Sequence, residues 1–83
     1  MKKVIATTNA PGAIGPYSQA IDTGSFVFIS GQIPVNPATG EIPEGIEAQA
    51  AQSMANIKAI LAEAGLTMDN VVKTTVFLAD MSL

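Results

Sequence analysis

The sequence predicts an α+β fold in which a β-sheet is covered on one face by a helix. Residues 14–34 have the pattern of a β-hairpin, and residues 71–78 alternate as a further strand. Residues 46–64 show the periodicity of an amphipathic helix. Strands that share one sheet, with a single helix packed across it, form two layers around one core. The other face of the sheet then needs a different cover.

The chain begins with a short stretch, Lys3–Ala6, that we expect to be an edge strand. Its central residues are β-branched, and lysines at the exposed end disfavour pairing with another chain. Residues 7–15 contain proline and glycine and read as a surface connection. Pro16 fixes its own φ and restricts Gly15 before it, so the approach to Tyr17 should be stiff.

The hairpin is predicted from two apolar strands that flank the turn signal Asp22-Thr23-Gly24. In the second strand Phe26 and Phe28 alternate with Val27 and Ile29, so both of its faces are apolar. A strand of this kind is buried on both sides. The helix can cover one side, and a neighbouring subunit is the simplest cover for the other.

The helix is expected at Ile46–Ala64, with Glu47 in its first turn and Gly65 as the residue that ends it. We expect its apolar stripe to face the sheet and its polar residues to face solvent. The stripe consists of Ala50, Met54, Ile57 and Leu61, and the polar side of Gln49, Gln52, Ser53, Asn56 and Glu63. Val71–Leu78 should follow as a strand of the same sheet, and Asp80 or Ser82 as the cap of a further helix.

Composition excludes several function classes. The 83 residues include no Cys and no His, so thiol catalysis and His-based general-base catalysis are unavailable, and an ordinary zinc site would have no ligands except carboxylates. A net charge of −3, with lysine as the only basic residue type, disfavours a nucleic-acid partner. We expect no transmembrane span and no signal peptide, and hence a cytoplasmic protein. Because 48% of the residues are hydrophobic and only 13% are charged, part of the surface should be buried against other chains.

One end of the hairpin brings together the residue types that a small-molecule site needs. Tyr17 supplies a phenol, Ser30 a hydroxyl, and Gly31 a backbone N–H without a side chain to block it. The competing interpretation is structural: a half-buried strand tyrosine, a satisfied serine and a glycine at a bulge. The residue pattern by itself favours this structural interpretation.

The segments Ile14-Gly15-Pro16-Tyr17-Ser18-Gln19-Ala20, Ser30-Gly31-Gln32-Ile33-Pro34-Val35-Asn36-Pro37 and Thr39-Gly40-Glu41, with their spacing, resemble the YjgF/RidA family. The resemblance runs from Lys2 to the last residue. It implies a chorismate-mutase-like fold with a mixed sheet. Family chains continue well past Leu83, so we expect residues 1–83 to be a single domain without the C-terminal helix and strands.

The resemblance also implies a function. Family members deaminate reactive 2-imino acids and enamines, such as those released by pyridoxal-phosphate-dependent serine and threonine dehydratases, to 2-keto acids and ammonia. They use no cofactor and act as homotrimers, with ligand clefts between subunits that Tyr17, Ser30 and Gly31 would line as substrate-binding residues. An arginine that holds the substrate carboxylate and a glutamate that helps to hold the attacking water belong to the part after Leu83. This chain contains no arginine, so we expect the 83 residues alone to be inactive and assign them no catalytic residue.

Two alternatives stay open. The first is a ligand-binding or chaperone-like trimer of the same fold without catalysis, which the absent arginine favours. The second is an endoribonuclease that inhibits translation, an activity attributed to some relatives. The acidic balance and the lack of His and Arg make it the least favoured of the three.

Overall fold

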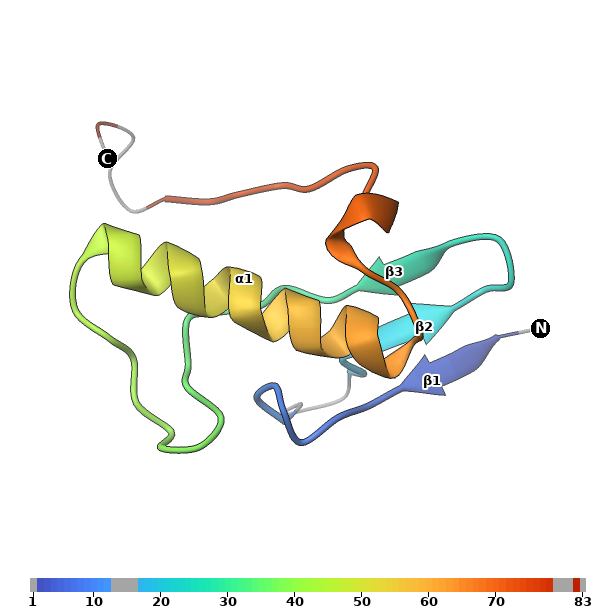
Figure 1. The fold of residues 1–83 in the computed structure, drawn as a ribbon, viewed down its shortest axis with the longest axis horizontal. Helices are drawn as coiled ribbons and strands as arrows, with labels where there is room; N and C mark the ends of the chain where they lie inside the picture. The colour runs from blue at the N-terminus through green and yellow to red at the C-terminus, as the bar shows by residue number, and fades with distance from the viewer. Residues whose placement is uncertain (1, 13–16, 79–81, 83) are drawn as a thin grey trace.

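The computed structural model describes residues 2–12, 17–78 and 82. Strands β1 (Lys3–Ile5), β2 (Ala20–Asp22) and β3 (Val27–Ile29) are followed by helix α1 (Ile46–Glu63) and the short 3₁₀ helix η1 (Met68–Asn70). The strands form one sheet in the order β1-β2-β3 (Figure 1). This arrangement confirms the α+β fold. Among the described residues every strand pairing is antiparallel, so the mixed character expected of the sheet is not seen there.

The hairpin and the N-terminal edge strand form as predicted. β2 pairs with β3 in a register that places Ala20 opposite Ile29, and β1 pairs with the other edge of β2. The turn is closed by the Thr23 N–H, which donates to the Phe26 carbonyl at 2.8 Å. Gly24 occupies a positive φ of 96°, which favours glycine. The stiffening attributed to Gly15 and Pro16 concerns residues outside those described.

The two faces of the sheet differ in what covers them. Ile5 and Ala20 lie on the face toward α1 and are buried with Ala10 and Ile60, and Val27 and Ile29 pack against them. Residues of the opposite face, among them Val4 and Phe28, are 60% and 64% exposed. The predicted second apolar face is therefore present, and in the single chain it is open to solvent.

Helix α1 ends at a glycine, as predicted. The Gly65 N–H donates to the Ala62 carbonyl at 3.0 Å, and the Leu66 N–H to the Leu61 carbonyl at 2.8 Å. Gly65 itself has a positive φ of 77°. This pair of hydrogen bonds around a left-handed residue is a Schellman motif, which satisfies carbonyl groups that the helix leaves without partners.

The predicted inward face of α1 was partly wrong. Leu61 is buried as expected, but Met54 is 42% exposed and Ala50 is also exposed, whereas Asn56 is only 1% exposed and Ile60 fully buried. The prediction assumed that amide side chains such as that of Asn56 face solvent. Asn56 instead donates to carbonyl groups of the loop after β3, which satisfies it in the interior and turns the helix toward that loop.

The prediction of a strand at Val71–Leu78 was also wrong for this structure. The segment is extended but belongs to no strand, and Figure 1 shows it running as a separate trace after η1. Val72, Val76 and Phe77 are 86%, 71% and 92% exposed. A segment becomes a strand only when it pairs with another, and this segment pairs with none of the described strands. Of the two predicted caps, Asp80 lies outside the described residues and Ser82 lies in a turn.

None of the helices in the described part of the chain is long and apolar enough to cross a membrane.

Candidate functional site

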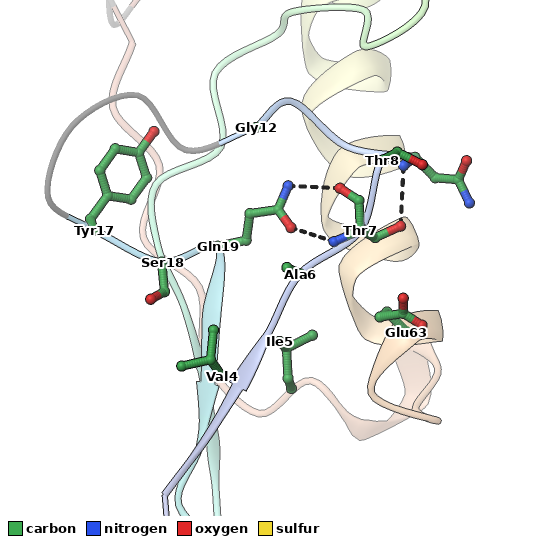
Figure 2. Close-up of a pocket in the computed structure, with 11 residues that line it drawn as sticks. Val4, Ile5, Ala6, Thr7, Thr8, Gly12, Tyr17, Ser18, Gln19 and Glu63 are labelled. Atoms are coloured by element: carbon green, nitrogen blue, oxygen red, sulfur yellow. Dashed lines mark hydrogen bonds between the residues drawn. The ribbon is translucent and has the colours of Figure 1, made fainter.

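An open hollow of about 600 Å³ lies at one end of the sheet, beside the start of the hairpin. One wall is the chain after β1, including Thr7, Thr8 and Gly12, and the other is Tyr17–Gln19 (Figure 2). Among the described residues that line it, Glu63, from the last turn of α1, is the only charged one. These residues therefore offer hydroxyl, amide and phenol groups together with one carboxylate, and no cationic side chain.

Tyr17 lines this hollow. Its side chain is 50% exposed, and Figure 2 shows the ring on the side away from Thr7 and Thr8. An exposed phenol beside an open volume can stack on a small planar molecule and exchange a hydrogen bond with it.

Ser30 and Gly31 lie just past β3 and are not among the residues that line the hollow. The backbone N–H and the hydroxyl of Ser30 both donate to the Gln19 carbonyl, at 2.9 and 3.1 Å. Its hydroxyl hydrogen is thus committed, while the oxygen retains lone pairs that can accept. Gly31 is exposed, and a Cβ built on it would meet nothing within 4 Å in the chain. The hairpin brings Tyr17 and Ser30 to the same end of the sheet. Tyr17 precedes Gln19 by two residues, and Ser30 lies opposite Gln19 across the hairpin.

Gln19 is the residue that the sequence analysis missed. Its side chain is 4% exposed. Its Oε1 accepts the Thr7 N–H at 2.6 Å, and its Nε2 donates to the carbonyls of Thr7 and Pro11 at 3.0 and 2.7 Å. A glutamine that follows a loop rich in proline and glycine was the available signal, because such loops leave backbone groups in need of partners.

Asn56 plays a similar part for the loop that follows β3. Its Nδ2 donates to the carbonyls of Ile33 and Val35 at 3.1 and 3.0 Å, and its Oδ1 accepts from Gln52 at 2.9 Å. These bonds tie the chain that leaves Ser30 and Gly31 to helix α1. Buried amides thus hold the segments on both sides of the hairpin end.

Metal binding gains no support from the described residues, which contain no group of three or more His, Cys, Asp or Glu side chains that could hold an ion.

Comparison with known proteins gives the context for this geometry. The family model described as Endoribonuclease L-PSP matches residues 7–83. A RutC family protein of Pasteurella multocida is 61% identical over 82 residues, which cover 99% of this chain and 64% of that protein. The 2-iminobutanoate/2-iminopropanoate deaminase of Escherichia coli K12 is 57% identical over 82 residues, with the same shares of the two chains.

A solved structure agrees with the sequence comparisons. The crystal structure of E. coli TdcF with bound serine has a TM-score of 0.94 and 55% identity, covering 96% of this chain and 63% of that one. The chain spans a little under two thirds of the length of these relatives, in their N-terminal part. The chain belongs to the YjgF/RidA family.

Proposed function

We propose that this protein takes part in the hydrolysis of reactive 2-imino acids and enamines, released by pyridoxal-phosphate-dependent dehydratases, to 2-keto acids and ammonia in the cytoplasm. The observation that carries this proposal is the 57% identity, over 82 residues, to the E. coli 2-iminobutanoate/2-iminopropanoate deaminase. The bound serine of the TdcF structure supports a small amino-acid-like ligand.

The reaction requires little from the protein beyond holding the imine and the attacking water in the right positions. Water adds to the imine carbon, the electron pair of the C=N bond moves to nitrogen, and the resulting carbinolamine loses ammonia to leave a ketone. Because no redox change occurs, orientation of the imine and of the water can supply much of the rate enhancement without a cofactor.

Tyr17, Ser30 and Gly31 are the residues we propose to bind substrate. The Tyr17 ring would cover the planar imine, and the accessible backbone at Gly31 would approach it closely. The Ser30 oxygen would accept a hydrogen bond from the substrate nitrogen or the water, since its own hydrogen is held by the Gln19 carbonyl.

The substrate carboxylate needs a partner that these residues do not supply. All basic residues of the chain are lysines, and the charged residue at the hollow is Glu63. A guanidinium grips a carboxylate through two parallel hydrogen bonds, which lysine cannot reproduce. We therefore propose that the family's arginine, from outside this segment, completes the site and that the 83 residues alone hydrolyse imines at the background rate.

The complete fold is proposed to be a homotrimer with its clefts between subunits. The support is the open sheet face, where Val4, Phe26 and Phe28 are at least 60% exposed and the two phenylalanine rings lie 6.3 Å apart between centroids. Contiguous exposed apolar surface of this kind marks an interface.

A non-catalytic binding or chaperone-like trimer remains the second candidate, favoured by the missing guanidinium. Endoribonuclease activity has the description of the family model in its favour. The net charge of −3 and the lack of His and Arg count against it, because phosphate contacts need cationic side chains.

The test is a fusion of these 83 residues to the C-terminal third of the E. coli deaminase. Threonine and a threonine dehydratase generate 2-iminobutanoate, and release of 2-oxobutanoate is followed above the uncatalysed rate. We expect turnover from the fusion and background from the 83-residue chain. A folded, trimeric fusion that binds 2-oxobutanoate without turnover would favour the binding module, and cleavage of single-stranded RNA by it would favour the ribonuclease.

A further inference from the structure

We propose that Gln19 is the positioning residue of this site, joining the loop that walls the hollow to the strand end that carries Ser30. Its part in the reaction rests on the proposed function. Its part in the geometry does not, and the two can be tested separately.

The side-chain amide of Gln19 both accepts hydrogen bonds from the backbone of residues 7–11 and donates hydrogen bonds to it. It accepts the N–H of Thr7 and donates to the carbonyl of the same residue, and it also donates to Pro11 at 2.7 Å and to Ala10 at 3.4 Å. Figure 2 shows the amide crossing from the hairpin to Thr7. A donor and an acceptor on one planar group are required for this pattern. Methionine has neither at this position, and a carboxylate has only acceptors.

The backbone of Gln19 makes the second connection. Its carbonyl accepts both the N–H and the hydroxyl of Ser30, so it sets the direction in which the Ser30 oxygen can accept a further hydrogen bond. Tyr17 lies two positions earlier in the chain, just before the bend at Gln19 that leads into β2. A shift of Gln19 would therefore move Ser30 and Tyr17 together.

Among the described residues, the side-chain amide of Gln19 makes all the hydrogen bonds between residues 7–12 and the hairpin, and Ala10 adds an apolar contact in the core. Removing the amide should leave the core contact in place and free the loop. The wall of the hollow formed by Thr7, Thr8 and Gly12 would then lose its fixed distance from Tyr17.

The first experiment uses the 83-residue chain and needs no turnover. Tyr17 is the only tyrosine and the chain has no tryptophan, so intrinsic fluorescence reports on this ring alone. In Gln19→Met we expect the quenching of Tyr17 by acrylamide to change and the amide hydrogens of Thr7 and Ser30 to exchange about tenfold faster or more. Leu61→Ala, a core change away from the hollow, is the control for a general loss of stability and should leave Tyr17 quenching as it is.

The matched variant Gln19→Glu tests the same contacts reversibly. A protonated carboxyl keeps a carbonyl acceptor and one O–H donor, one donor fewer than the amide, whereas a carboxylate has no donor and would face the carbonyls of Thr7, Ala10 and Pro11. Its pKa should therefore be raised, so that native-like quenching is present at low pH and lost as pH rises through this pKa. Glu63 and Tyr17 are the other titratable groups at the hollow, and the unmodified chain measured over the same pH range accounts for them. This variant decides the question should Gln19→Met fail to fold.

In the fusion described above, Gln19→Met should lower kcat/KM for 2-iminobutanoate by about 10- to 100-fold, because small displacements of positioned groups cost this much. Leu61→Ala in the same fusion should stay within about twofold at a temperature where both are folded. An inactive parent fusion would contradict the proposed imine hydrolysis. The positioning role of Gln19 would then be tested by fluorescence quenching and hydrogen exchange alone. Unchanged quenching, exchange and kcat/KM in a folded Gln19→Met protein would overturn the positioning role.

Discussion

Replacing Asn56 by leucine should destabilise this fold markedly, although the change makes the helix more apolar. Asn56 is 1% exposed and donates to the carbonyls of Ile33 and Val35. A buried carbonyl left without a donor costs roughly 1–3 kcal/mol. The Ile33 carbonyl keeps the Val35 N–H as a donor at 2.8 Å, so the full penalty falls on the Val35 carbonyl alone. With the loss of the less costly bond to Ile33 added, the sum should be about 2–4 kcal/mol. For a domain of this size, that corresponds to a fall in Tm of roughly 10–25 °C.

Urea unfolding followed by far-ultraviolet circular dichroism measures this loss. Gln52→Ala is the matched control, because it removes only the 2.9 Å bond from Gln52 to the Asn56 oxygen and should cost about 0.5–1.5 kcal/mol. Asn56→Asp should be most stable in acid: its pKa is raised by burial and by the facing carbonyls, and stability is lost as pH rises through it. A free energy of unfolding for Asn56→Leu within about 0.5 kcal/mol of the parent would refute the reasoning.

Three further changes test the core, the site and the assembly. Leu61→Ala should cost about 2–5 kcal/mol in urea unfolding, and a negligible loss would mean that Leu61 is not packed as described. Gly31→Val should leave the chain's own stability nearly unchanged, because a Cβ at this position meets nothing within 4 Å. It should nevertheless reduce keto-acid release by the fusion more than Tyr17→Phe does, because Tyr17→Phe removes only one hydroxyl, worth about 0.5–1.5 kcal/mol. Equal losses from the two would contradict close backbone approach at Gly31. Phe28→Asp, on the open sheet face, should convert the proposed trimer of the fusion to monomers in sedimentation, and an intact trimer would place the interface elsewhere.

The local elements of this fold could be predicted from sequence because short-range signals determine them. The turn at Asp22-Thr23-Gly24 predicted the hairpin, and Gly65 predicted the end of α1. The inward face of α1 was harder to predict. Asn56 is satisfied by Ile33 and Val35, which lie more than twenty positions earlier in the chain, so periodicity alone could not reveal that it is buried.

The strand predicted at Val71–Leu78 failed for a related reason. Alternating β-branched residues give a segment strand propensity, but pairing depends on where the tertiary fold places the segment relative to a sheet edge. The candidate site contains one residue that local sequence could place and one that depends on the tertiary fold. Tyr17 could be placed at the hollow from its position at the hairpin mouth, whereas the part of Gln19 depends on four backbone contacts with a loop whose path the sequence does not specify.

Ligand mapping on the fusion tests the central claim most directly, because it asks where the keto acid binds. Titration with 2-oxobutanoate, followed by amide and aromatic NMR signals, should shift the resonances of Ser30, Gly31 and the Tyr17 ring at concentrations that also inhibit imine hydrolysis. A second hollow, which Thr39 and Glu41 of the loop after β3 line together with Gln52 of α1, should stay unperturbed. Shifts confined to that second hollow, or inhibition with no change at Tyr17, Ser30 and Gly31, would show that the chemistry takes place elsewhere.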